Sequence, residues 1–523
     1  MTGMQAPIPS QRPQPNTGHS APAPGTTAAS SPGTSGQTRI TAKAAKRMLV
    51  LSALLALLFA VLASLVTYLL DPLQFYHKPF GYKPIFSSEQ RYQNPGLALH
   101  YDYDTIILGT SMTENFLPSE VDKALGGKTL KLSIRGSTAD EQYQIAKLAI
   151  GTGKVKQALW GLDYFALKTG DQESAGPFPA YLYDRNRWND YRYLLNYSVY
   201  GQFFRGVYKE LTGSGVQSLE KLYNWNDSVT FGKKEVLAHY RTAAQEEAYF
   251  GLNEDPLDVI QANFDTEVLA LVKAHPEVKF IFYYPPYSVL REAVWASTNA
   301  ERYRNQLEMD VWMFERLNGL PNAEVYNFQT AGEWTYDLDR YKDLSHHDQA
   351  INTAIIHTIG AGDSRYRMTT ANAQALSDEL EEQVRTLALT ETGDPKSVQL
   401  LVGSAASSAK EVWFSSLAIP GEGELLVPAK EAAAALGATL DWNQATKTLT
   451  LAHAANRVSL TLDQTKAVDK DGSTIELAQP ARLVGGQTQV PLLRLASVLG
   501  YDVSEERPNA WSLRYTVTER AAK

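Results

Sequence analysis

The chain has 523 residues, enough for two or three domains, and 44% of them are apolar, which is ample for folded cores. Its 57 acidic and 49 basic residues give a net charge of −8, so no nucleic acid is expected as a partner. The absence of cysteine excludes disulfides, thiolate metal sites and cysteine nucleophiles.

The N-terminal 47 residues are predicted to be a disordered tail, because Pro, Ser, Thr, Gly, Ala and Gln dominate the segment. Residues 48–70 carry no charge and are long enough to cross a bilayer. A cleavable signal peptide is the alternative, but its apolar part would be shorter and would end in small residues. We expect an uncleaved transmembrane helix. The preceding cations place the N-terminus in the cytoplasm and everything after it outside the cell: Arg39, Lys43, Lys46 and Arg47.

Residues 71–365 alternate short β-rich runs with helical spacing. The pattern predicts buried strands at residues 103–111 and 278–288. It predicts helices at residues 118–127, 139–153 and 263–276. Such alternation predicts an α/β fold, a three-layer parallel sheet flanked by helices, with functional side chains at the carboxyl ends of the strands.

Between these strands, residues 178–211 are crowded with aromatics and Arg. One interpretation is a helical insertion that packs on the core. The other is a lid or a wall that contacts saccharide, since aromatic faces suit sugar rings.

A polar linker, residues 366–397, contains an amphipathic stretch and leads to a small α+β repeat domain, residues 398–518. Val-Pro pairs beginning at Val427 and Val490 each precede a Leu-Gly pair by nine positions, which predicts one structural unit occurring twice. This region resembles the copper amine oxidase N-terminal-like domain, for which a binding or spacing role is the default. Its single histidine, His453, has no ligands near it in sequence, so we expect no copper.

Ser111 follows Gly109 and Thr110 at the end of the first predicted strand. A hydroxyl there is a candidate nucleophile, although a serine in a tight turn explains the pattern equally well. Late in the domain, Asp343 lies three residues before His346, a spacing that lets a carboxylate orient an imidazole. The alternative is that Asp343 or Ser345 caps the next helix. The two motifs together supply the components of a Ser-His-Asp triad.

The stretches "LGTSMTENF" and "YKDLSHHDQ" resemble two blocks of the SGNH, or GDSL-type, hydrolase superfamily. The arrangement is similar to the membrane-anchored exported branch, which includes the D-alanyl transfer protein of teichoic-acid D-alanylation and alginate O-acetyltransferases. The resemblance implies that Ser111 is the nucleophile, His346 the general base and Asp343 its orienting carboxylate.

The same resemblance places the oxyanion donor of the second block on Gly136. The third block departs from the family, because Gly161 and Asp163 stand where a Gly-x-Asn-Asp pattern is expected. Asp163 is therefore the candidate for this block's position at the oxyanion site. Asn115 is a candidate replacement for the missing asparagine donor. His347 competes with His346 for the role of base, although spacing favours the latter.

We expect a membrane-anchored extracytoplasmic serine acyltransferase or esterase that acts on a cell-envelope polymer without a cofactor. Its expected partners are an envelope or extracellular polysaccharide and a membrane acyl-donor protein. A non-catalytic SGNH-like scaffold or cell-wall binding protein is the second hypothesis. A metal-dependent hydrolase is the third, built on the dense group Asp343, His346, His347 and Asp348.

Overall fold

The computed structural model describes residues 42–80, 83–169, 178–184, 186–213, 218–249, 254–390, 392–403, 410–412, 419–421, 424–484 and 486–520. The predicted disordered tail, residues 1–47, lies outside the described residues up to position 41. Positions 42–47 are already helical.

The first element, α1 (Ala42–Leu70), is a single helix of 29 residues. In the described part of the chain, it is the one helix long and apolar enough to cross a membrane. The predicted span, residues 48–70, lies inside it, so the single apolar helix is confirmed. The side of the membrane on which its N-terminus lies stays a prediction.

The end of α1 is hydrogen-bonded to the aromatic segment, residues 178–211. Thr67 donates a hydrogen bond to the Leu194 carbonyl (2.7 Å). Just after the helix, the Asp71 carboxylate accepts from the Tyr193 hydroxyl (2.7 Å) and from the backbone N–H groups of the next turn. Tyr193 belongs to α5 (Tyr191–Leu194), which is followed by α6 (Tyr197–Leu211). Residues 191–194 and 197–211 of the aromatic segment are therefore helical, and their Tyr193 and Val199 are buried, as the first interpretation predicts.

A five-stranded sheet forms the centre of the region after α1, in the order β2-β1-β3-β4-β5 with every pair parallel. Its strands are β1 (Thr105–Leu108), β2 (Thr129–Lys131), β3 (Gln157–Gly161), β4 (Lys279–Tyr284) and β5 (Ala323–Asn327). The strand order reverses between β1 and β3. The carboxyl ends of those two strands are therefore where a parallel sheet of this kind opens a crevice.

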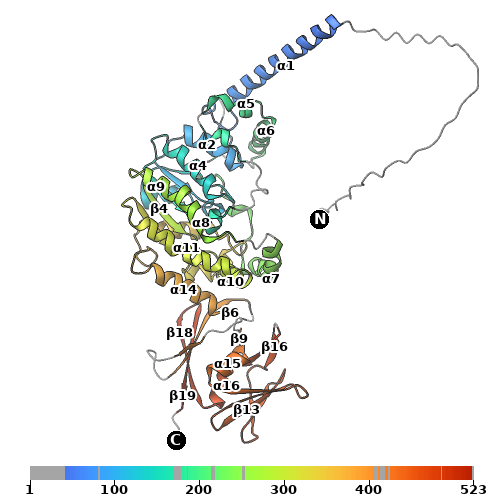
Figure 1. Cartoon of the computed structure of the whole chain (residues 1–523), viewed down its shortest axis with the longest axis vertical. Coiled ribbons are helices and arrows are strands. Elements are labelled where there is room, and N and C mark those ends of the chain that lie inside the picture. Colours follow the sequence, from blue (N-terminus) through green and yellow to red (C-terminus); the bar gives the residue numbers. More distant parts are fainter. Residues whose placement is uncertain are drawn as a thin grey trace, which may run out of the picture. The chain divides into compact units, whose positions relative to one another are not determined.

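Helices cover both faces of this sheet. Side chains of neighbouring residues in a strand point to opposite faces, so the strands contribute to two separate buried clusters. Ile106 belongs to one buried apolar cluster and Ile107 to another. The first cluster takes side chains from α2 (Gln90–His100), α4 (Ala139–Ile150), α8 (Leu257–Phe264), α9 (Ala270–Ala274) and α11 (Ala300–Asn318). The second takes them from α3 (Pro118–Leu125), α7 (Lys233–Tyr249), α10 (Val289–Thr298) and α13 (Gln349–Gly360). The predicted α/β fold with a parallel sheet is confirmed (Figure 1).

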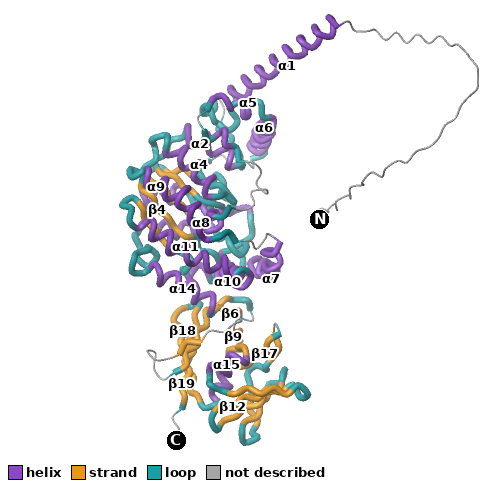
Figure 2. Tube along the Cα trace, viewed as in Figure 1, coloured by secondary structure: helices purple, strands orange, loops and turns teal. Residues whose placement is uncertain are grey.

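Strands dominate the chain after α14 (Ala373–Arg385), as Figure 2 shows. The predicted linker, residues 366–397, contains α14, β6 (Leu387–Leu389) and the start of β7 (Pro395–Val402). β7 pairs with β6, with β8 (Lys410–Val412) and with β19 (Ser512–Glu519). A separate antiparallel sheet runs through β11 (Thr439–Asn443), β12 (Thr448–His453), β13 (Asn456–Thr461), β14 (Lys466–Asp469) and β15 (Thr474–Glu476).

The predicted repeat is a structural one. β10 (Glu424–Pro428) leads into α15 (Ala429–Ala435), and β17 (Gln487–Pro491) leads into α16 (Leu492–Val498), which is followed by β18 (Tyr501–Asn509). β10 and β17 pair antiparallel with Val427 opposite Val490, so the two Val-Pro motifs lie side by side. β17 and β10 share their sheet with β16 (Arg482–Val484) and β9 (Ile419–Gly421). The glycines of both Leu-Gly pairs have positive φ, as a residue that ends a helix commonly does.

Candidate active site

Ser111 lies where β1 ends and begins a short 3-10 turn, Ser111–Thr113. The turn depends on Gly109, whose φ of 135° is rare for residues with a side chain. A Cβ at Gly109 would also lie 2.7 Å from the Thr113 side chain and 3.0 Å from the Gly161 carbonyl. Glycine is therefore required at this position, and it lets the chain turn sharply and present the Ser111 hydroxyl at the carboxyl edge of the sheet.

Ser111 is hydrogen-bonded to a histidine that follows it by 235 residues. Its Oγ lies 2.8 Å from Nε2 of His346. The other ring nitrogen, Nδ1, lies 2.9 and 3.0 Å from the two carboxylate oxygens of Asp343. Serine, histidine and aspartate thus form a continuous chain of hydrogen bonds, and the carboxylate favours the tautomer in which Nε2 accepts a proton.

Asp343 is arranged to remain ionised. Burial pushes its pKa upward, but hydrogen bonds from the His346 ring and from the backbone N–H groups of Ser345 and His346 hold the pKa below its usual range. The carboxylate can therefore stabilise a positive charge that develops on the imidazole.

The alternative that Asp343 or Ser345 caps the following helix is excluded. α13 begins at Gln349, and its N-cap is Asp348, whose carboxylate accepts from the backbone N–H of Ile351 (3.0 Å). His347 is buried, and its Nδ1 lies 3.2 Å from the Asp348 carbonyl. Burial lowers the pKa of His347 to about 4. Between the two adjacent histidines, the structure brings His346 to Ser111.

A second chain of hydrogen bonds supports the residue before Ser111. Thr110 Oγ1 donates to Asp163 Oδ2 (2.7 Å), and the Tyr287 hydroxyl donates to the other oxygen of the same carboxylate. These three residues follow the adjacent strands β1, β3 and β4, so the network ties their carboxyl ends together. Burial raises the pKa of Asp163. The sequence points to Asp163, but nothing in it points to Tyr287 as its partner.

Replacing Tyr287 by Phe should reveal the strength of this network. The variant loses a buried hydrogen bond to a carboxyl group, so we expect the free energy of unfolding to fall by about 1.5–3 kcal/mol. Tyr283→Phe is the matched control. The Tyr283 hydroxyl is also buried but has no hydrogen-bond partner in the described part of the chain, so its removal should cost little or nothing. Denaturant unfolding measures both, and equal losses in the two variants would contradict the assignment.

Among the described hydrogen bonds, none joins Asn115 or Gly136 to Ser111, His346 or Asp343. Asn115 is buried and its Oδ1 accepts from the backbone N–H of Trp225 (3.1 Å), while its Nδ2 has no partner among the described residues. Gly136 has a φ of 57°, and its carbonyl accepts from Arg91 (3.3 Å). Their role as oxyanion donors stays a prediction, as does that of Asp163.

Trp225 packs against the candidate base. Its ring centroid lies 5.7 Å from that of His346 in an edge-on arrangement, and the Lys342 ammonium lies 4.4 Å from the indole centroid. Through the bond from its backbone to Asn115, this tryptophan connects the turn after Ser111 with the imidazole. Sequence reasoning missed Trp225, because its segment carries no motif and the contact joins parts of the chain far apart in sequence.

Lys131 is a buried side chain next to the Ser111 turn. The side chain is 1% exposed, and its Nζ donates to the Glu114 carbonyl (2.6 Å). Burial lowers the pKa of Lys131 to about 7, and the nearby Glu114 carboxyl raises it only in part. Glu114 itself is buried, and it accepts from Gln90 (2.5 Å) and Arg135 (3.1 Å).

The buried lysine predicts a pH dependence of stability. The unfolded chain binds the Lys131 proton up to about pH 10.4, whereas the folded chain releases it near 7. Between these values the unfolded state holds more protons, so stability should rise with pH. Lys131→Met should remove this slope. We expect the variant to gain stability relative to the natural protein at about pH 6 and to lose most of that advantage by about pH 9.5. Denaturant midpoints measured at both values test this, and a difference independent of pH would contradict it.

No group of three or more histidine and carboxylate side chains within the described ranges has the arrangement of a metal site.

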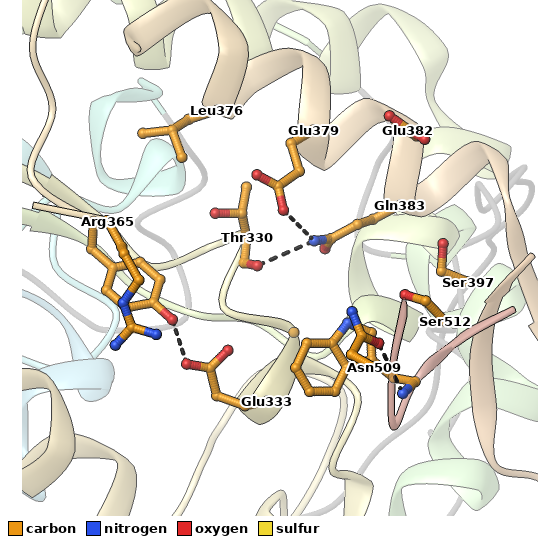
Figure 3. A pocket seen from close by; sticks show the side chains of 13 residues that line it. Thr330, Glu333, Arg365, Leu376, Glu379, Glu382, Gln383, Ser397, Asn509 and Ser512 are labelled. Atoms are coloured by element: carbon orange, nitrogen blue, oxygen red, sulfur yellow. Dashed lines mark hydrogen bonds between the residues drawn. The ribbon is translucent and has the colours of Figure 1, made fainter. Parts of the chain in front are cut away.

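A hollow of about 470 Å³ lies among the residues shown in Figure 3. There Gln383 donates to the Thr330 carbonyl (3.1 Å), and Tyr366 donates to Glu333. None of its lining residues is a predicted site residue, so the hollow is separate from the Ser111 site.

One family of known proteins matches part of the chain. The family described as the copper amine oxidase N-terminal domain matches residues 409–510, which confirms the resemblance predicted for the C-terminal region. Among solved structures, the chain is similar to a Streptococcus pneumonia protein provisionally described as a platelet activating factor, with 11% identity, a TM-score of 0.26 and coverage of 57% of this chain and 92% of that chain.

The chain is also similar to a gut microbial diltiazem-metabolizing enzyme, with 10% identity, a TM-score of 0.24 and coverage of 72% of this chain and 61% of that chain. No curated protein matches. Because both TM-scores are below 0.5, the function has to be argued from the site itself.

Proposed function

We propose that residues 71–365 are an SGNH-type serine acyltransferase or esterase. The observation that carries the proposal is the hydrogen-bonded chain from Ser111 through His346 to Asp343, with heavy-atom distances of 2.8 and 2.9 Å. A hydroxyl needs an adjacent base to become a nucleophile, and an oriented imidazole is the commonest such base.

The reaction begins when Ser111 Oγ attacks the carbonyl carbon of an acyl donor and His346 Nε2 takes the hydroxyl proton. The bond from carbon to the leaving group breaks, and His346 returns the proton to that group. The acyl group is then an ester on Ser111. A second hydroxyl, from a sugar, a polyol or water, loses its proton to His346 and takes the acyl group, which restores the serine. Asp343 keeps the imidazole oriented and stabilises its positive form.

The negative oxygen formed at each attack needs hydrogen-bond donors. The backbone N–H of Gly136 is one proposed donor. Asn115 is the other, because its buried Nδ2 is a donor without a partner among the described residues. Asp163 is a carboxyl group already bonded to Thr110 and Tyr287, so we assign it to support of the Ser111 turn. Each missing donor costs on the order of 10²–10³ in rate.

The proposed substrate is a cell-envelope polymer or a lipid-linked one, since an enzyme held at a membrane acts on what lies near that membrane. In this proposal the protein crosses the cell membrane once, its N-terminus is cytoplasmic and its catalytic domain is extracellular. A membrane protein would supply the acyl group. The C-terminal copper amine oxidase-like domain, residues 398–518 in the proposed division, would contact the wall polysaccharide.

A fluorophosphonate probe, which reacts with activated serines, tests the proposal on the full chain in detergent. We expect one label per chain in the natural protein and none in Ser111→Ala. Ser119→Ala is the control, because Ser119 is exposed and bonded to Glu220 and should not affect labelling. Labelling that persists in Ser111→Ala would rule out the nucleophile.

A non-catalytic scaffold is the second candidate. One observation favours it. The third block has Asp163 where an asparagine could donate a hydrogen bond, and the Asp163 carboxyl group already accepts from Thr110 and Tyr287. The same experiment separates the two functions, since a scaffold would leave the natural protein unlabelled.

A further inference from the structure

Helix α6 is apolar on two opposite faces. The inner face packs on the domain through Val199, which is fully buried, and through Gly206, where a Cβ would lie 2.3 Å from the side chain of Ile85. The outer face presents large side chains spaced by seven, four and three residues, which is the spacing of one helix face. These residues are 62–87% exposed: Tyr197, Phe204, Tyr208 and Leu211.

Such a face is unusual on a domain surrounded by water, because contiguous exposed apolar side chains of this size mark a surface that something else covers. Further exposed side chains of the same kind lie just before α6: Trp188 (92% exposed), Tyr191 on α5, and Leu195, which follows α5 directly. Helix α6 itself also carries two cations, Arg205 and Lys209. Aromatic and basic residues together are typical of segments that lie at a bilayer surface.

The position of α6 next to the end of α1 identifies what covers this face. The Tyr200 hydroxyl donates to the Ala63 carbonyl of α1 (3.0 Å), and it is also hydrogen-bonded to Thr67. Thr67 donates to the Leu194 carbonyl at the end of α5. Thr67 lies three residues before α1 ends, about 4.5 Å along the helix axis. A bilayer crossed by α1 would therefore reach the level of α5 and α6.

We infer that α6, with Trp188 and α5, is a second membrane-contacting element that rests on the surface of the bilayer that α1 crosses. The outer aromatic face enters the boundary between headgroups and acyl chains, and Arg205 and Lys209 meet the headgroup phosphates. The hydrogen bonds of Tyr200 with Ala63 and Thr67 hold α6 beside the last turns of α1. The inference rests on α1 spanning a bilayer and is independent of the acyl-transfer chemistry.

The absence of cysteine from the natural chain makes a direct test possible, because each introduced cysteine is the sole attachment site for a dye. Phe204→Cys and Tyr208→Cys report on the outer face of α6. Leu51→Cys reports on α1, and Leu483→Cys is a matched control at an exposed apolar side chain in another domain. The full chain is labelled with the polarity-sensitive dye NBD. It is then placed in vesicles of phosphatidylcholine and phosphatidylglycerol with or without dibrominated acyl chains, which quench dyes in contact with them.

We expect bromolipid to quench NBD at positions 51, 204 and 208 and to leave position 483 unchanged. Quenching at 51 without quenching at 204 and 208 would overturn the inference while leaving the anchor intact. Energy transfer between copies at 204 in place of quenching would also overturn it, because the face would then be covered by a second chain. Absence of quenching at all four positions would overturn both the anchor and the inference.

Replacing Phe204, Tyr208 and Leu211 together by Ser should leave the fold intact, because all three side chains point away from the domain. In that variant we expect NBD at Tyr191→Cys to lose at least half of its quenching, while NBD at Leu51→Cys keeps its own. Unchanged quenching at position 191 would show that the outer face of α6 does not hold this region on the bilayer.

Discussion

Ser111→Ala is expected to lower the turnover of an activated ester such as p-nitrophenyl acetate by on the order of 10⁴- to 10⁶-fold. The variant lacks the atom that forms the acyl bond, and His346 then has no hydroxyl to activate. The hydroxyl is small and its only described side-chain partner is His346, so the fold should be unaffected. Release of p-nitrophenolate by the purified full chain measures the effect.

Ser119→Ala serves as the control in this assay too and should keep the natural rate. A loss of less than tenfold in Ser111→Ala, with the natural protein clearly active, would show that another group performs the reaction.

Asp343→Asn is expected to lower the same turnover by about 10⁴-fold. The amide is close in size to the carboxylate, but its NH₂ group favours the histidine tautomer with the proton on Nε2, which cannot accept the Ser111 proton. The pKa of Asp343 lies below its usual range, so the natural carboxylate stays ionised at any pH at which the protein is assayed.

Asp348→Asn is the matched control for this substitution. Asp348 lies five residues further on, caps α13 and pairs with Arg340, and asparagine is also a good N-cap. Asp348→Asn should lower the free energy of unfolding slightly and the turnover by at most a few-fold. Equal losses of rate in the two variants would mean that Asp343 acts only through the local fold.

The parallel sheet is predictable because its signals are local. Ser111 and His346 are 235 residues apart, and their partnership could be predicted only because two short motifs resemble two blocks of one hydrolase superfamily. Apolar runs that end in Gly109-Thr110-Ser111 specify a strand and its turn, and the Asp-x-x-His spacing brings a carboxylate to an imidazole within one loop. The choice between His346 and His347 follows from where α13 begins. The cap at Asp348 fixes the preceding loop so that His346 faces Ser111.

The supporting residues could not be predicted, since their contacts join distant parts of the chain. Tyr287 and Asp163 are 124 residues apart and meet only because β3 and β4 are neighbours in the sheet. Trp225 reaches His346 from a loop that has no regular pattern. The sequence around Lys131 is that of an ordinary strand, and nothing in it indicates that the side chain is buried with its Nζ donating to the Glu114 carbonyl.

The proposed membrane contact of α6 also shows where a sequence pattern is ambiguous. The spacing of aromatics in residues 197–211 suits a buried helix, a lid or a membrane surface equally well. Burial resolves part of the ambiguity, because Val199 and Gly206 face the domain while Phe204 and Tyr208 do not.

The central claim is that Ser111 carries the acyl group during the reaction. The direct measurement is the intact mass of the full chain after a brief incubation with p-nitrophenyl acetate and an acid quench, followed by peptide mapping of the adduct. The account predicts one acetyl group per chain, located on Ser111 and absent from Ser111→Ala. An unmodified natural protein, or an acetyl group that persists on another residue when Ser111 is replaced, would contradict it.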